Sequence, residues 1–523
     1  MVYIEFFGKR VDKMAGIAAV LFDSKEKGNR AKELLSSISE NISHRGKRKK
    51  FISEINGFKK GYACILSNYD LNRESLYGDD GSFTLIDGKI YNIDSLLREH
   101  DIIGHKKQTQ DSYKFSLLFN KLGIKSFKLL EGSFALLYVD SKGNVFLARD
   151  FIGRKPLYYA VSQSDDLMLI GSEIKLFKDL GEYFEIKELM PGNYIKNDSE
   201  QIRFKALDLD ANYIFLSDYE KLGNSVDCID RLLNDSVKKR ISKNNAYKYG
   251  VWLSGGLDSS VIAAVMKKFK EEIHTYSVGF NDSADILYSR KVAKHIVSRH
   301  YEYNFDINEI FNLIPEVIYT LESFDAPLVR SSIGNLIVSK ISSESDIVFS
   351  GEGGDEVFAG YNYFLNIDSP DLIQTELLNA INSLHNTALQ RVDRFANRYS
   401  IDVKYPFLDE QLISYSLMIP AELKIDKKKK ATKNILRKVA EKYLPADIVW
   451  RTKDKFWEGS GIYDKLKIKI DSIISDKEFD KNSLLKNGFR LRNKEEYYYY
   501  KIFTGFFPDI DYSKLLSFTE DFN

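Results

Sequence analysis

The sequence predicts a multidomain protein of the α/β and α+β classes, in which a layered, β-rich part is followed by a parallel sheet. Residues 14–205 contain short apolar segments between turn signals, and the segments at 16–22 and 132–139 are typical strands. Further along the chain, expected strands at 249–254 and 273–278 alternate with helical patterns. That alternation indicates βαβ units, whose strands lie parallel in one sheet.

A change in the sequence pattern along the chain predicts where the domains lie. With 523 residues, two or three domains are expected, each large enough for its own core. The polar stretch at 197–212 has no strong pattern and indicates a linker. We therefore expect an N-terminal extension at 1–13, a first domain at 14–205, a linker at 206–225, a second domain at 226–515 and a tail at 516–523.

Composition limits the classes of partner and compartment. The 76 basic and 75 acidic residues give a net charge of +1, which argues against a nucleic-acid partner. Cys64 and Cys228 lie far apart and form no C-x-x-C motif, so we expect neither a disulfide framework nor a structural zinc site, and we expect a reducing cytoplasm. No apolar run approaches the roughly 20 residues of a membrane span. The first residues, 1–13, lack the apolar core of a signal peptide, so no membrane partner is expected.

The most informative segment for function is 249–260, where an apolar strand runs into a Ser-Gly-Gly turn and then a helix. Glycines let backbone N–H groups approach a phosphate closely, and the helix begins there with the positive end of its dipole. The expected phosphate ligands are Ser254, Gly255, Gly256, Ser259 and Ser260. The segment lacks the lysine of a Walker A loop. It is instead typical of enzymes that cleave ATP between the α and β phosphates and form an adenylate.

Acidic residues accompany this loop and a second one. A carboxylate beside a phosphate is repulsive unless a cation bridges them, so Asp258 predicts Mg²⁺ on the leaving pyrophosphate. The segment 350–356 is again a strand end that runs into glycines, and it carries Glu352, Asp355 and Glu356. Loops at the carboxyl ends of parallel strands meet at the switch point of the sheet, so both loops can face one ligand. Three acids beside a triphosphate indicate magnesium ligands or acid–base groups that act on the acceptor.

Together these motifs resemble the glutamine-dependent asparagine synthetase family. In the second half, the similar segments are 254–260, 277–280, 350–356, 359–361, 405–409, 450–456 and 493–503. In the first half, they are 43–46, 130–135, 148–159 and 171–174. The resemblance covers nearly the whole chain. It implies an N-terminal nucleophile hydrolase-like αββα sandwich, then an ATP-pyrophosphatase domain of the adenine nucleotide α-hydrolase-like kind, and a homodimer.

The resemblance also implies roles for individual residues. Glu352 would lie at the acyl-adenylate centre, as the base when ammonia attacks, and Lys453 would neutralise the phosphates in the transition state. Asp258 and Asp355 would bind magnesium and pyrophosphate. The residues that would line the nucleotide are Leu253, Val278, Ser350 and Gly351.

The expected acceptor region is the segment 325–330, with Asp325 and Arg330 as candidate ligands. Arg330 could clamp a carboxylate through two parallel hydrogen bonds. Pro327 and Leu328 stand where the family often has hydroxyl-bearing residues. Strict specificity for aspartate therefore does not follow from this segment.

The N-terminal half departs from the family at its reaction centre. The family's glutaminase uses a cysteine at the start of the mature chain, whose free α-amine is the base. Here the matching residue is Ala15, and further residues precede it. The glutamine-holding Asn-Gly-Glu is replaced by a segment with Asp87 and Lys89 at its ends, and the expected arginine is Ile65. Only Asp111 remains of the glutamine-binding polar set, so we expect a degenerate glutaminase.

Three functions remain open from the sequence. The first is a ligase that uses ATP and Mg²⁺ to adenylate a carboxylate, that of the aspartate side chain, and forms an amide with ammonia, either free or delivered by a separate glutaminase. The second keeps the adenylation but amidates or cyclises another carboxylate, such as a sugar acid, a peptide or a natural-product precursor. The third is a non-catalytic nucleotide-binding regulatory protein. The intact acidic loops argue against the third, because buried carboxylates without a use are costly.

Overall fold

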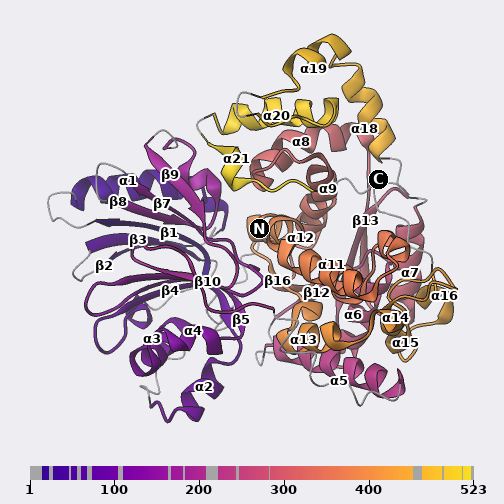
Figure 1. The fold of residues 1–523 in the computed structure, drawn as a ribbon, viewed down its shortest axis with the longest axis horizontal. Helices are drawn as coiled ribbons and strands as arrows, with labels where there is room; N and C mark the ends of the chain where they lie inside the picture. Colours follow the sequence, from indigo (N-terminus) through magenta and orange to yellow (C-terminus); the bar gives the residue numbers. More distant parts are fainter. Residues whose placement is uncertain are drawn as a thin grey trace, which may run out of the picture. The chain divides into compact units, whose positions relative to one another are not determined.

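The computed structural model describes most of the chain, in two compact units (Figure 1). One unit comprises residues 1–205 with 242–247, and the other comprises 206–241 with 248–523. The described residues are 14–22, 28–45, 49–55, 60–67, 73–103, 110–162, 167–180, 183–207, 222–242, 247–281, 283–451, 462–485, 488–508 and 510–519. None of the described helices combines the length and the apolar character that a membrane crossing requires.

The N-terminal unit contains two antiparallel sheets. The strand order of the first is β2-β3-β1-β8-β7-β9, and that of the second is β11-β10-β6-β5-β4. The first sheet comprises β1 (Met14–Phe22), β2 (Lys49–Ile55), β3 (Lys60–Ser67), β7 (Tyr158–Ser162), β8 (Leu167–Gly171) and β9 (Phe184–Glu188). The second comprises β4 (Phe83–Ile90), β5 (Gly132–Val139), β6 (Val145–Arg149), β10 (Asn193–Lys196) and β11 (Ile202–Arg203). The strands expected at 16–22 and 132–139 are thus confirmed.

The two sheets pack face to face, and helices cover their outer faces. Alternating residues such as Ile17 of β1 and Leu137 of β5 point into one apolar layer between the sheets. The helices are α1 (Gly28–Glu40) on the first sheet, and α2 (Ile93–Glu99), α3 (Asp111–Leu122) and α4 (Lys125–Leu129) with the second. Phe115 and Phe127 of these helices pack on Tyr138 and its neighbours in a second core. The layers follow the order α-β-β-α, which confirms the predicted sandwich.

The C-terminal unit is built on a parallel five-stranded sheet with the order β14-β13-β12-β15-β16. Its strands are β12 (Tyr249–Trp252), β13 (His274–Gly279), β14 (Arg299–Asn304), β15 (Ile347–Phe349) and β16 (Asp402–Lys404). All four residues of β12 are buried, as expected for a central strand covered on both faces. The chain leaves β12 toward β13 on one side and returns to β15 on the other. The switch point of this sheet therefore lies at β12.

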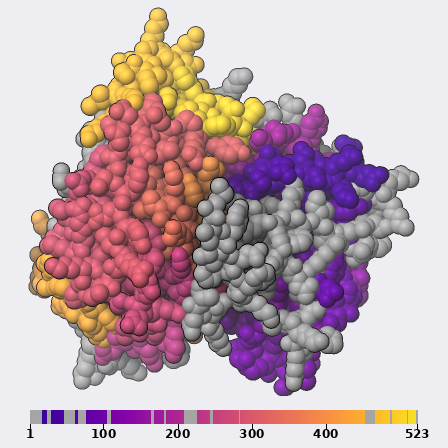
Figure 2. All heavy atoms as spheres, turned by 180° about the vertical axis from the view of Figure 1, so that it is seen from behind, coloured from indigo at the N-terminus to yellow at the C-terminus, as the bar shows by residue number. Residues whose placement is uncertain are grey.

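Helices connect and extend this sheet. They are α5 (Leu222–Arg240), α6 (Leu257–Lys267), α7 (Ala284–His295), α8 (Ile307–Leu321), α9 (Ala326–Ile341), α10 (Gly354–Phe358), α11 (Pro370–Ser383), α12 (Ala388–Arg398), α13 (Glu410–Met418), α14 (Ala421–Lys424), α15 (Asn434–Ala440) and α16 (Ala446–Val449). The final helices are α18 (Ile462–Asp471), α19 (Asp476–Asn482), α20 (Lys494–Phe506) and α21 (Tyr512–Leu515). Helix α20 packs on α8, and this last part of the chain forms a continuous surface, yellow in Figure 2.

Candidate active site

The site is built at the carboxyl end of β12, where the chain turns into α6. Gly255 has a left-handed φ of +69°, and a Cβ there would come within 2.6 Å of the Asp285 carbonyl oxygen, so only glycine fits. Ser254 is exposed, and its Oγ lies 3.1 Å from Ser259 Oγ and 3.3 Å from the Gly256 nitrogen, whose N–H donates to it. These contacts gather a hydroxyl and a backbone donor at the start of a helix of 11 residues. Such a concave set of donors suits an anion.

Ser260 differs from the other serines of this loop. It is fully buried, and its hydroxyl donates to the Gly256 carbonyl oxygen at 2.6 Å. Within the described contacts, Ser260 stabilises the first turn of α6. Its expected role as a phosphate ligand stays a prediction.

The second loop follows β15 and packs directly against the first. A Cβ at Gly351 would lie 2.8 Å from the Ser259 nitrogen, and one at Gly354 would lie 2.6 Å from Asp258 Cγ. Neither position can carry a side chain without displacing the first loop. The glycines thus permit the two acidic loops to meet, which the sequence predicted from the switch-point geometry.

Lys433 joins the carboxylates of the two loops. Its Nζ forms an ion pair with Asp258 and lies 2.7 Å from Asp355 Oδ1. The lysine side chain is 4% exposed, whereas the carboxylate side chains are 16% and 18% exposed. Lys433 precedes α15 and has a left-handed φ of +55°. The sequence interpretation missed this residue, because the chain is rich in lysine and Lys433 is 175 residues from Asp258.

Glu352 has a cationic partner as well. Its Oε1 accepts a hydrogen bond from Arg391 Nη2 of α12 at 2.9 Å, and both side chains are about one-fifth exposed, at 22% and 19%. The Glu352 N–H donates to Ser350 Oγ at 3.3 Å. Gly353 follows with a φ of +93°. The carboxylate is therefore held in one place while it stays accessible.

The third acid of the loop has a different environment. Glu356 is buried, and Tyr361 OH donates a hydrogen bond to its Oε1. Burial, reinforced by the neighbouring Asp355 charge, raises the pKa of Glu356 to about 7. The buried Glu356 therefore pairs with a tyrosine that is itself 37% exposed.

The residues expected to line the nucleotide lie on neighbouring strand ends. The Leu253 N–H donates to the Tyr276 carbonyl oxygen at 2.8 Å, which continues the β12–β13 ladder beyond β12. Val278 lies near the end of β13, and Ser350 follows β15. The structure therefore brings these positions to the same edge of the sheet as Ser254 and Asp258. Nucleotide contact itself stays a prediction.

The two expected acceptor ligands are engaged by the C-terminal segment. Asp325 caps α9 and forms an ion pair with Arg492 at 2.5 Å, and it also accepts from the Thr519 hydroxyl. Arg330 Nη1 lies 2.7 Å from Glu495 Oε2 of α20. Lys453, the expected catalytic lysine, lies outside the described residues. The assignment of an acceptor role to these residues stays a prediction.

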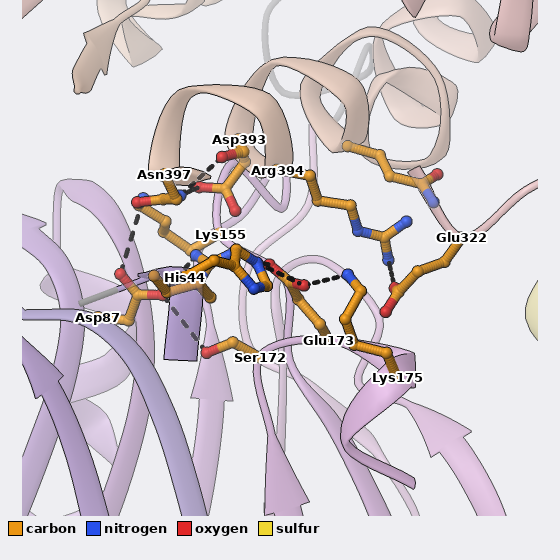
Figure 3. Close-up of polar contacts among 12 residues, drawn as sticks. His44, Asp87, Lys155, Ser172, Glu173, Lys175, Glu322, Asp393, Arg394 and Asn397 are labelled. Carbon is orange, nitrogen blue, oxygen red and sulfur yellow. Dashed lines mark hydrogen bonds and ion pairs between the residues drawn. The ribbon is translucent and has the colours of Figure 1, made fainter. Parts of the chain in front are cut away.

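The N-terminal unit contains a buried charge cluster, of which Figure 3 labels His44, Asp87, Glu173 and Lys175. Arg45 donates to Glu173 Oε1 at 2.7 Å and to Asp87 Oδ2 at 3.0 Å, and all three side chains are fully buried. Lys175 and His44 also pair with Glu173. Burial alone would raise the pKa of Glu173, but His44, Lys175 and Arg45 hold this pKa well below its usual value. The cluster therefore pairs cations with carboxylates at buried positions.

At the expected glutamine site, Lys89 pairs with Asp111. Lys89 Nζ lies 2.9 Å from Asp111 Oδ1, and the Ile90 N–H donates to Asp111 Oδ2 at 3.0 Å. Gly88 between Asp87 and Lys89 has a φ of +113°. Ala15 lies in β1 where the register with β3 shifts, and Ile65 lies in β3.

Comparison with known proteins identifies both units. The family model described as Asparagine synthase matches residues 228–373 and 365–509, and that described as Glutamine amidotransferase domain matches residues 14–201. The chain is 28% identical over 539 residues to the probable glutamine-hydrolyzing asparagine synthetase of Dictyostelium discoideum, with 95% of this chain and 94% of that protein covered. It is 32% identical over 459 residues to the glutamine-hydrolyzing asparagine synthetases of Gallus gallus and Homo sapiens, with 80% and 78% of this chain and 81% and 80% of those proteins covered.

The chain belongs to the asparagine synthetase family. The N-terminal sandwich is its amidotransferase domain, and the parallel-sheet unit is its ATP-pyrophosphatase-like domain. The chain is therefore an ATP-dependent carbon–nitrogen ligase that forms AMP. The predicted fold class and family are confirmed.

Proposed function

We propose that the enzyme adenylates the side-chain carboxylate of aspartate and forms an amide with ammonia that its own N-terminal unit does not produce. The observation that carries the adenylation is the convergence of Asp258, Lys433 and Asp355 beside the loop of Ser254 and Gly255. An acceptor oxygen attacks the α-phosphorus of ATP, and pyrophosphate leaves. Ammonia then attacks the acyl carbon, AMP leaves, and a proton of the ammonia passes to Glu352.

Mg²⁺ belongs to this proposal. Asp258 and Asp355 offer the hard oxygen ligands that Mg²⁺ prefers, and the Lys433 ammonium that contacts both carboxylates supports a place for positive charge there. Among the described residues, no group of three or more His, Cys, Asp or Glu side chains could hold a metal ion alone. Mg²⁺ commonly takes one or two carboxylates together with phosphate oxygens and water. The pair therefore fits a metal that arrives with ATP, where it would offset the charge of the leaving pyrophosphate.

The proposed nitrogen source rests on the N-terminal unit. Ala15 carries no nucleophile, so the covalent step of a glutaminase has no thiol at this position. The ammonium of Lys89 already pairs with Asp111, the one acid left to hold the α-ammonium of glutamine. A bound glutamine would have to displace an ion pair within the same domain. Both observations support ammonia from another source, either free or from a separate glutaminase.

A second candidate changes only the acceptor. Arg330, the expected carboxylate clamp, is paired with Glu495 and has an exposed side-chain fraction of 10%. A different carboxylate, such as a sugar acid or a peptide, would not need this arginine. We keep aspartate first because the relatives named above are asparagine synthetases.

In the proposed mechanism, the positive charge of Lys453 stabilises the transition state. A positive charge there would act mainly as negative charge builds on the phosphates, so Lys453→Ala should lower turnover more than nucleotide affinity. We expect a loss of about 100-fold or more in pyrophosphate exchange, typical of a lost transition-state contact. An exchange rate within about threefold of wild type would assign Lys453 to the surface instead.

The direct test is a pyrophosphate-release assay over a panel of carboxylates. Aspartate, glutamate, a hexuronic acid and a peptide carboxylate are each combined with ammonium or with glutamine. We expect release of pyrophosphate and AMP with aspartate and ammonium. Release only with another carboxylate would favour the second candidate. A protein that binds ATP but releases no pyrophosphate with any acceptor would contradict the proposed function.

A further inference from the structure

Arg451 contacts the turn of residues 254–256, which we call the phosphate loop. Its Nη1 donates to the Gly255 carbonyl oxygen at 2.9 Å, and its Nη2 lies 2.5 Å from Asp285 Oδ1 of α7. The guanidinium also lies over the Tyr288 ring, 4.5 Å from its centroid. The arginine side chain is 8% exposed. One guanidinium thus holds the loop against the helix that packs on it.

Arg451 holds the Gly255–Gly256 peptide. The N–H of this peptide is one of the donors of the expected anion site beside Ser254. In a trans peptide, the carbonyl and the following N–H point in opposite directions within one plane. The Gly255 carbonyl faces Arg451, while the Gly256 N–H donates to Ser254 Oγ on the exposed side of the loop. Fixing the carbonyl therefore fixes the direction of this N–H. The absence of a side chain at Gly255 leaves its backbone otherwise free to rotate, which makes such a restraint useful.

Arg451 is itself anchored from the element that carries Lys433. Arg437 of α15 donates from Nη1 to the carbonyl oxygens of Val449 and, at 3.2 Å, of Arg451. Its Nε donates to the Thr432 carbonyl oxygen at 2.9 Å, next to Lys433. Hydrogen bonds therefore connect the backbone beside Lys433 with the backbone of the phosphate loop.

We infer that Arg451 is a positioning residue that orients the Gly255–Gly256 peptide for the β and γ phosphates of ATP. This role rests on the proposed function and deepens it. It predicts that the loss of affinity depends on the pyrophosphate part of the nucleotide, because the oriented N–H belongs to the expected anion site. AMP lacks that part and should not depend on Arg451.

Binding of two nucleotides tests this inference without any acceptor. Calorimetry measures the affinity of α,β-methylene-ATP with Mg²⁺, and that of AMP, for the full-length wild type and its variants. Arg451→Ala should weaken the ATP analogue about tenfold or more, as expected for a lost hydrogen bond to a charged group, and leave AMP within about twofold. Arg451→Lys keeps one donor and the charge but cannot reach both acceptors, so its affinity should be intermediate.

Arg290→Ala is the matched control. Arg290 lies on the same helix α7, and its guanidinium pairs with Glu302 of β14 at 2.8 Å. Its loss should change neither affinity. Equal losses of affinity for the ATP analogue and for AMP in Arg451→Ala would show a merely structural role. Unchanged affinity for the analogue would show no role. Either result would overturn this inference but leave the proposed function in place. A wild type that bound neither nucleotide would refute the proposed function together with this role.

Discussion

The two units of the enzyme use clustered charges in opposite ways. In the N-terminal unit, Arg45, Asp87, Glu173 and Lys175 have no exposed side-chain surface, and their two positive and two negative charges offset one another. In the C-terminal unit, Lys433 joins Asp258 and Asp355, whose carboxylates keep 16% and 18% of their surface. Both clusters pair cations with carboxylates at short distance. The second cluster leaves part of its carboxylate surface accessible to a ligand, so solvent access, rather than charge content, distinguishes the two clusters.

The largest expected effect is that of Glu352→Gln. Glutamine preserves size and hydrogen bonding but removes the base, so amide formation should fall by a factor of about 100 to 10,000 while ATP still binds. Product formation by mass spectrometry and ATP binding by calorimetry measure the two steps. Arg391→Gln is the matched control, because it removes the partner of Glu352 but leaves the base. An unchanged rate of amide formation in Glu352→Gln would show that this carboxylate is not the base.

The next effect separates the base from the metal ligands. Asp258→Asn and Asp355→Asn each remove one carboxylate from the proposed magnesium pair, so the Mg²⁺ concentration that supports half-maximal pyrophosphate release should rise about tenfold or more. Magnesium titration of the two variants and of Glu352→Gln measures it. Rescue of Glu352→Gln by excess Mg²⁺, without rescue of the two Asn variants, would reverse the assignment of base and metal ligands.

A stability effect should distinguish the buried cluster from the exposed pair in the N-terminal unit. Arg45→Met leaves Asp87 and Glu173 without their shared guanidinium, and breaking a buried pair costs about 3–5 kcal/mol. Lys89→Met breaks a pair in which the lysine side chain is 46% exposed, so it should cost less than about 1 kcal/mol. Urea unfolding of both variants gives the comparison. Similar losses would show that the buried cluster is not what stabilises this unit.

The last expected effect is a pH dependence of stability and concerns Lys424 of α14. Burial lowers the pKa of Lys424 to about 7, from 10.5 in the unfolded chain. Between these values the unfolded chain binds more protons, so the free energy of unfolding should fall as the pH decreases, by about 1.4 kcal/mol per pH unit. Lys424→Met should remove this slope relative to wild type. Lys427→Met, at an exposed lysine three residues further on, should keep it; parallel curves for wild type and Lys424→Met would contradict a neutral buried lysine.

The loops of the site could be predicted because their constraints are local. Glycines that permit close approach stand beside acids that need a cation, at Gly255 and Asp258 and again at Gly354 and Asp355. The alternation of strands and helices then placed both loops at one edge of the sheet. The sandwich itself followed from the resemblance to a family, with the strands supported by their apolar pattern.

Other parts of the site depend on contacts between distant segments. Lys433 carries no local signal among the many lysines of the chain, and Arg391 lies 39 residues from Glu352. Arg330 resembled a substrate clamp, yet it pairs with Glu495, 165 residues away. Long side chains of this kind find their partners through the tertiary fold, which periodicity and spacing do not describe.

The central claim is that the C-terminal unit forms the amide while the N-terminal unit supplies no ammonia. The most direct measurement supplies the purified enzyme with ATP, Mg²⁺ and aspartate, together with ¹⁵N-labelled ammonium and unlabelled glutamine, and follows the isotope in the amide by mass spectrometry. We expect the amide nitrogen to carry the label and no glutamate to form above the background without enzyme. Unlabelled amide that appears together with an equal amount of glutamate would contradict the account.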